Sequence, residues 1–203
     1  MRSYNTRVAV LLYALVAGLA LSLGFVRGDP DLYHHPRPLF ELPLWQGLVI
    51  GTAVGVIFGL AVVWLTQRAV MKWRLRSAVR LQVGLRQLLG VSDTPLTELD
   101  IVALALSSAV AEELLFRGWL VPLAGVVLSS FAFGLLHFAP NNRGMWVWMP
   151  MAFVMGLIFG GSFLVIGNLA APIVAHGVIN YRNLHFVNSY DPTISINKEE
   201  AKT

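Results

Sequence analysis

The sequence has no cysteine and few charged residues. Of its 203 residues, none is cysteine, 13% are charged and 56% are hydrophobic. The lack of cysteine excludes disulfides, thiol catalysis and thiolate metal sites. Soluble domains carry about 25% charged residues, so the low charge argues against a soluble domain. The mean hydropathy of +0.66 and the long apolar runs instead predict a protein that crosses a membrane several times.

The apolar runs predict the fold class and the domain organisation. We expect an all-α protein, a multi-pass transmembrane helical bundle of about six spans with one basic amphipathic helix outside the membrane. An N-terminal region with two spans and the basic helix (1–97) precedes a four-helix intramembrane core (98–187) and a polar C-terminal tail (188–203). The predicted spans lie near residues 8–26, 46–66, 98–123, 126–139, 147–166 and 168–187.

The basic residues predict how the chain is oriented. The segment 67–97 contains six arginines and lysines before its first acid, Asp93, and its apolar residues recur near helical spacing. This pattern fits a helix lying on an anionic leaflet, or equally a cytoplasmic linker helix. Because basic residues flank apolar spans, the lipid bilayer explains the positive charge better than nucleic acid does. Their distribution predicts a cell-membrane protein with both termini in the cytoplasm.

Two adjacent glutamates, Glu112 and Glu113, lie inside the apolar run from Ile101 to Gly125. An ionised carboxylate within a bilayer costs several kcal/mol unless it is paired or hydrated, so such acids are functional candidates. Glu113 and Arg117 are four residues apart, a spacing that lets them pair on one helix face. Glu112 points about 100° away from Glu113 and is free for another role. The pair therefore predicts one structural acid and one functional acid.

The position of the next turn decides whether Glu112 can meet His137. With a turn at Gly118, the two residues would lie at different depths. With a turn at Pro122–Gly125, both would lie about 18–20 Å below it, at the same depth. The sequence Pro-Leu-Ala-Gly favours this second turn. We therefore predict the reversal at Pro122–Gly125 and interpret Gly118 as a small residue that permits close packing.

The last apolar segment contributes a second polar pair. His176 and Asn180 are four residues apart and therefore share one helix face. At the predicted depths, this face can approach Glu112 and His137. We predict that these four residues form one cluster. His185 has no companion at helical spacing, and we expect it to be an ordinary hydrogen-bond partner between helices.

Three short motifs in the core resemble those of a known family. The sequence contains EELLFRG from Glu112 to Gly118, FGLLH from Phe133 to His137 and HGVIN from His176 to Asn180. In this order and in apolar helices, they resemble the EExxxR, FxxxH and HxxxN motifs of the CPBP intramembrane proteases. That family includes type II CAAX prenyl endopeptidases and Abi-like bacteriocin-processing or immunity proteins. The resemblance covers about residues 94–187.

The resemblance implies a role for each motif residue. Glu112 and His137 would activate a water molecule, and His176 and Asn180 would stabilise the oxyanion. Glu113, Arg117 and Phe133 would support the site. The implied activity is an intramembrane endopeptidase that needs no cofactor and acts on a membrane-associated protein or peptide.

Two alternatives stay open at the level of sequence. Glu112, His137 and His176 could instead hold a catalytic zinc ion, since two histidines and a carboxylate form a known set of ligands. The absence of an HExxH helix weakens this alternative. The chain could also be a non-catalytic membrane protein, such as an immunity protein, that uses the cluster to bind a hydrophobic peptide.

Overall fold

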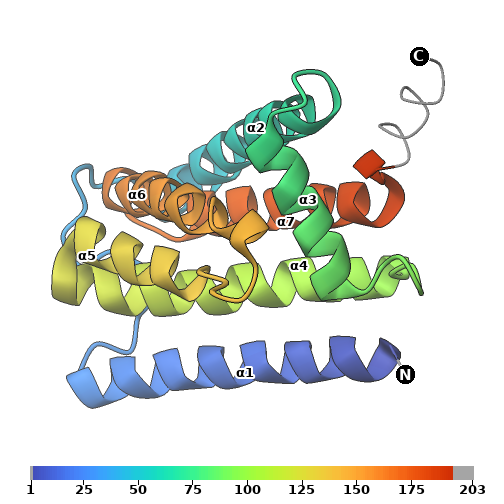
Figure 1. The fold of residues 1–203 in the computed structure, drawn as a ribbon. Coiled ribbons are helices and arrows are strands. Elements are labelled where there is room, and N and C mark those ends of the chain that lie inside the picture. Colours follow the sequence, from blue (N-terminus) through green and yellow to red (C-terminus); the bar gives the residue numbers. More distant parts are fainter. Residues whose placement is uncertain (1, 194–203) are drawn as a thin grey trace.

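The computed structural model describes the backbone of residues 2–193 and the side chains from Thr6 onward. The predicted C-terminal tail therefore lies mostly outside the described residues. Apart from one isolated bridge between His34 and Asn168, all regular structure in the described part is helical, as predicted (Figure 1). The α-helices are α1 (Arg2–Arg27), α2 (Leu44–Met71), α3 (Arg76–Leu89), α4 (Glu98–Glu113), α5 (Val121–Leu136), α6 (Trp148–Ile166) and α7 (Ala170–Ser189). A π-helix, η1 (Leu114–Leu120), joins α4 to α5, and a 3-10 turn, η2 (Arg143–Met145), precedes α6.

The predicted number of spans is wrong. Within the described residues, four helical segments are long and apolar enough to cross a membrane: Thr6–Arg27, Leu44–Met71, Glu98–Leu136 and Arg143–Ile166. Two predicted spans, 98–123 and 126–139, fall in one of these segments, which folds back on itself at Gly125. The sixth predicted span corresponds to α7, which is not among the four because it carries polar residues along much of its length. The four segments support a membrane protein, while the cytoplasmic location of both termini stays a prediction.

The helical segment 98–136 reverses direction at Gly125. This residue has φ 81° and ψ 168°, which no helix accommodates. Beyond it, the Ser129 hydroxyl donates a hydrogen bond of 2.7 Å to the carbonyl of Phe116, and the rings of Phe116 and Phe133 lie 5.1 Å apart. A straight helix would hold residues 116 and 129 about 20 Å apart. The predicted reversal is therefore confirmed, and its antiparallel register places position 137 opposite position 112.

Gly118 permits a close approach between η1 and the loop that joins α1 to α2. A Cβ atom at Gly118 would lie 2.5 Å from the carbonyl oxygen of Leu32, closer than real contacts allow. Leu32 is buried, and Arg27 at the end of α1 donates a 2.9 Å hydrogen bond to the carbonyl of Trp119. The interpretation of Gly118 as a packing residue rather than a turn is confirmed.

A face of glycines joins α2 to α7. Four glycines of α2, spaced four residues apart, are buried along this face: Gly47, Gly51, Gly55 and Gly59. A Cβ at Gly55 would lie 2.7 Å from the carbonyl oxygen of Ala171, and one at Gly59 would lie 2.9 Å from Cβ of Val178. Small residues at this spacing let helix backbones approach closely in membranes. The glycine face thus fixes the position of α7, which carries His176 and Asn180.

The basic helix α3 is docked against the end of α7. Gln82 donates a 3.1 Å hydrogen bond to the carbonyl of Tyr190, and the Arg86 guanidinium donates to the carbonyls of Val187 and Tyr190. These bonds satisfy carbonyls at the end of α7 that have no partner within the helix. One face of α3 therefore contacts protein, as a linker helix requires, while Arg76 remains exposed.

Candidate active site

The two glutamates lie where α4 changes into the π-helix η1. Single-turn π segments within α-helices are frequent at functional sites. The Glu113 side chain is fully buried, and its Oε1 accepts a 3.0 Å hydrogen bond from Nη1 of the equally buried Arg117. The ion pair predicted from the four-residue spacing is therefore confirmed.

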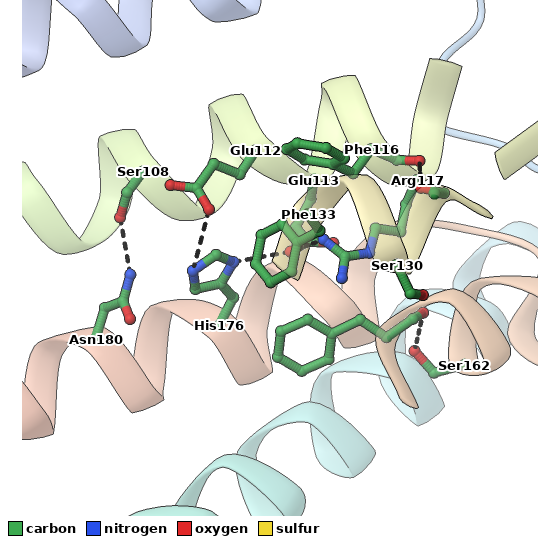
Figure 2. A network of polar contacts seen from close by, with 12 residues as sticks. Ser108, Glu112, Glu113, Phe116, Arg117, Ser130, Phe133, Ser162, His176 and Asn180 are labelled. Carbon is green, nitrogen blue, oxygen red and sulfur yellow. Dashed lines mark hydrogen bonds and ion pairs between the residues drawn. The ribbon is translucent and has the colours of Figure 1, made fainter. Parts of the chain in front are cut away.

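Glu113 also contacts α7. The same Oε1 atom lies 2.8 Å from Nδ1 of His176 (Figure 2). An ionised carboxylate only accepts hydrogen bonds, so Nδ1 of His176 carries the hydrogen. Sequence reasoning assigned Glu113 to Arg117 alone. The structure adds that Glu113 fixes the ring orientation of His176.

Glu112 faces the other ring nitrogen of His176. Its Oε2 atom lies 3.9 Å from Nε2 of His176, on the opposite side of the ring from Glu113 (Figure 2). This oxygen is buried and makes no hydrogen bond with the described residues. Oε2 of Glu113 is likewise buried without a hydrogen bond, so the two glutamates differ in the other oxygen: Arg117 and His176 hold Oε1 of Glu113, which ties Glu113 into the bundle as predicted.

Asn180 lies on the same face of α7 as His176 and also contacts α4. Its Nδ2 atom donates a 2.9 Å hydrogen bond to the Ser108 hydroxyl (Figure 2). Since the amide nitrogen carries two hydrogens, one of them remains available for another acceptor. Ser108 lies one turn before Glu112 on α4. Sequence reasoning missed Ser108, although the four-residue spacing to Glu112 was a usable signal.

His137 ends α5 and stands beside this cluster. Its Nδ1 lies 2.8 Å from the carbonyl oxygen of Phe133, which can only accept, so Nδ1 carries the hydrogen and Nε2 keeps its lone pair. The ring packs against Phe133 and, edge-on at 5.0 Å, against Trp148. His137 is within electrostatic range of Glu112 and His176. Within the described residues, however, no hydrogen bond or ion pair joins it to either.

Aromatic rings enclose the charged part of the site. The Arg117 guanidinium lies 4.4 Å from the ring centre of Phe133 and 5.2 Å from that of Phe159. Phe159 also stacks on His176 at 5.6 Å. Such cation–π contacts stabilise a buried cation where water is excluded. They place Phe133 beside the site, and they add Phe159, which none of the three motifs contains.

Helix α1 also reaches the site. Tyr13 of α1 lies close to Glu112, near enough for the two side chains to interact electrostatically. This contact agrees with the packing of α1 along α4, which Figure 1 shows at the lower edge of the molecule. No motif in the first two apolar runs pointed to Tyr13. A lone tyrosine in an apolar helix more often marks a membrane interface.

The zinc alternative stays a hypothesis. Among the described residues, no three of the His, Asp and Glu side chains are grouped closely enough to hold one metal ion as they stand. Nδ1 of His137 and of His176 each has a protein partner, which leaves Nε2 of each ring as the nitrogen that could bind a metal.

His185 joins two helices, as predicted, but through a close approach of charged groups. Its Nε2 lies 3.0 Å from Oε2 of Glu98 at the start of α4, while the same nitrogen makes no hydrogen bond with the described residues. This contact joins α7 to α4 outside the candidate site. The predicted contact between helices is present, and the predicted hydrogen bond is not.

Comparison with known proteins agrees with the motifs. A family model described as "Type II CAAX prenyl endopeptidase Rce1-like" matches residues 94–182, fewer than half of the 203 residues. "Uncharacterized protein YpbD" of Bacillus subtilis (strain 168) is 35% identical over 80 residues, which are 39% of this chain and 41% of that relative. The chain thus spans about two fifths of the length of this curated relative. No solved structure matches the chain. The family match runs from the start of α4 into α7, includes all three motifs, and confirms that this part of the chain is similar to the type II CAAX prenyl endopeptidases.

Proposed function

We propose that the chain is an intramembrane endopeptidase that hydrolyses a peptide bond in a membrane-associated substrate. The family match supports a protease of the CAAX type. The observation that carries the proposal is the buried, unpaired Oε2 of Glu112 facing Nε2 of His176 at 3.9 Å. A carboxylate of this kind, within reach of an imidazole, is suited to take a proton from water.

Glu112 acts as the general base. A water molecule donates a hydrogen bond to Oε2, and its oxygen attacks the carbonyl carbon as the proton moves to the carboxylate. Tyr13 of α1 lies close to this carboxylate. Glu113 is less suited to this role. Its Oε2 is also buried and unpaired, but Arg117 and His176 hold its Oε1 and stabilise the ionised carboxylate, which makes it a weaker base.

His176 and Asn180 stabilise the oxyanion that forms on the substrate. As an imidazolium, His176 donates from Nδ1 to Glu113 and from Nε2 to the oxyanion. Together with the guanidinium of Arg117, its positive charge balances the negative charges of the two glutamates. Asn180 gives one amide hydrogen to Ser108 and has the second for the oxyanion. Removal of one such donor lowers kcat by about 10²–10³-fold in other enzymes.

His137 delivers the proton to the leaving amine. Because its Nδ1 hydrogen is held by the carbonyl of Phe133, its Nε2 lone pair can accept a proton from Glu112 or from an intervening water. The protonated ring then donates that proton to the amide nitrogen as the C–N bond breaks. The carbonyl carbon keeps the water oxygen, so the products are a carboxylate and an amine.

The test compares Glu112→Gln with Glu98→Gln. Glutamine has the shape of glutamate but cannot act as a base, and Glu98 is an exposed acid at the other end of α4. Peptides in membrane fractions from cells with each variant would be compared by mass spectrometry. We expect Glu112→Gln to abolish a set of cleavage products that Glu98→Gln retains, with both proteins folded and inserted. Full cleavage by Glu112→Gln would refute the proposed base.

The same experiment addresses the non-catalytic alternative. A protein that only binds a hydrophobic peptide would protect or retain that peptide without producing new termini. The peptides from cells with and without the wild-type chain would then have the same ends. That outcome would refute the proposed hydrolysis and favour the binding role.

A further inference from the structure

A cavity of about 190 Å³ lies at the bend between α2 and α3. We name it the α2–α3 cavity. Val70 and Val79 give it an apolar wall, and the chain after α7 adds Tyr190. Arg74, Arg76 and Arg80 also line it, and we call the exposed Arg76 and Arg80 its rim arginines. The cavity therefore combines cationic and apolar side chains, and none of its lining residues belongs to the candidate active site.

The rim arginines are available for a ligand. Arg76 and Arg80 are exposed, and neither forms a hydrogen bond or an ion pair with the described residues. Among the described residues, no acidic side chain lines the cavity. The nearby Asp191 lies 3.4 Å from Arg86 and accepts hydrogen bonds from Thr193, so other partners already engage it. An anion at the rim would thus meet two arginines without a competing carboxylate in the cavity wall.

The cavity lies where a membrane surface is expected. It directly follows the candidate span that ends at Met71. The rings of Trp64 and Trp73 lie 6.4 Å apart on either side of this end, and Arg68 stacks over Trp64 at 5.2 Å. Tryptophan and arginine together at the end of an apolar span are typical of the headgroup region of a bilayer.

We propose that the α2–α3 cavity binds the headgroup of an anionic phospholipid. Arg76 and Arg80 donate to the phosphate, a geometry that suits the planar guanidinium. Val70 and Val79 contact the first methylene groups of the lipid. A soluble phosphate compound would leave this apolar wall without a partner. Because the cavity lies beside a membrane span, anionic phospholipids would be the most abundant anions around it.

The site is joined to α7 through one residue. Tyr190 lines the cavity, and its carbonyl accepts hydrogen bonds from Gln82 and Arg86 of α3. A bound lipid therefore touches the contacts that hold α3 against the end of α7. The inference itself does not depend on the proposed hydrolase activity, because lipid binding can be measured without a substrate.

The test measures lipid retention by the purified full chain. The protein would be placed in nanodiscs that contain phosphatidylcholine with and without phosphatidylglycerol, and bound lipids would be counted by native mass spectrometry. The Arg76→Gln/Arg80→Gln variant removes both rim charges. The control, Arg37→Gln/Arg182→Gln, removes the same charge from two exposed arginines elsewhere. Thermal unfolding midpoints would establish that all proteins are folded.

We expect the wild type to retain phosphatidylglycerol in preference to phosphatidylcholine. Each basic residue near an anionic surface contributes about a fivefold gain in binding, so the double variant should lose roughly 25-fold. If that variant does not fold, Arg76→Gln and Arg80→Gln alone should each lose about fivefold. Equal retention of both lipids, or an equal loss in the control, would overturn the proposal. Displacement of the lipid by inorganic phosphate at the same concentration would overturn the lipid assignment in favour of a soluble anion.

Discussion

Replacement of Arg117 by methionine tests whether the Glu113–Arg117 ion pair holds the bundle together. The side chains are 0% and 1% exposed, and the charged atoms are 3.0 Å apart. At an effective dielectric constant of 20, two charges 4 Å apart attract each other by about 4 kcal/mol. Methionine keeps much of the volume of arginine but leaves the Glu113 carboxylate buried without its main counterion. Breaking a buried pair in this way costs about 3–5 kcal/mol.

We therefore expect Arg117→Met to lower the free energy of unfolding by about 3–5 kcal/mol. The measurement is reversible unfolding in mixed detergent micelles, followed by tryptophan fluorescence. Asp29→Asn is the control, because it breaks the partly exposed pair that Arg27 and Asp29 form at 2.8 Å. Pairs at such positions contribute about 0–1 kcal/mol.

A second variant separates charge from packing. In Glu113→Gln/Arg117→Met neither charge remains, and the amide oxygen of the introduced glutamine can still accept from His176, so most of the lost stability should return. A loss below about 1 kcal/mol for Arg117→Met would refute a buried charge pair. Failure of the double variant to recover would show that arginine acts mainly by packing against Phe133 and Phe159.

Three further predictions concern the turn at Gly125, the glycine face of α2 and the side-chain amide of Asn180. Gly125→Ala forces a side chain into φ 81° and should destabilise the fold by about 1–2 kcal/mol in the same unfolding assay; no change would contradict the turn described above. Gly55→Leu should prevent folding, because even a Cβ there would lie 2.7 Å from a backbone oxygen; size-exclusion chromatography in detergent would detect the loss of the folded protein. Gly18→Leu is the control and should be tolerated, because nothing lies within 4 Å of a Cβ at Gly18. Equal behaviour of the two variants would refute the close packing. Ser108→Ala removes the hydroxyl that accepts from that amide and should lower kcat by up to about 10-fold with little change in KM. Ser107→Ala, whose hydroxyl donates to a carbonyl of its own helix, is the control, and equal losses would exclude a positioning role.

The core of the site could be predicted because its residues follow helical spacing. Glu113 and Arg117 pair across one turn, and His176 and Asn180 share one face, as the spacing of four requires. The reversal at Gly125 could be placed because only one position brings residues 112 and 137 to the same depth. These features depend on local helix geometry, which can be worked out from the sequence.

Features that depend on contacts between distant helices could not be predicted in the same way. Tyr13, 99 positions before Glu112 in the sequence, reaches the site only because α1 packs along α4. The shared use of Glu113 by Arg117 and His176 needs the depth and rotation of α7, which the glycine face of α2 fixes. The number of candidate spans was overpredicted because apolar runs do not show that 98–123 and 126–139 belong to one segment that folds back at Gly125, or that α7 is too polar to count as a span.

The double use of one carboxylate oxygen has a consequence for how the sequence of such a protein can evolve. Since Oε1 of Glu113 binds both Arg117 and His176, the stability of the bundle and the orientation of the His176 imidazole depend on the same atom. Among the described residues, neither oxygen of Glu112 takes part in a hydrogen bond of this kind, so we expect its loss to disturb the helix packing less than the loss of Glu113. A descendant released from catalysis would therefore be free to replace Glu112 early, while Glu113 and Arg117 would have to change together. An inactive copy could thus keep an intact fold with a single altered acid.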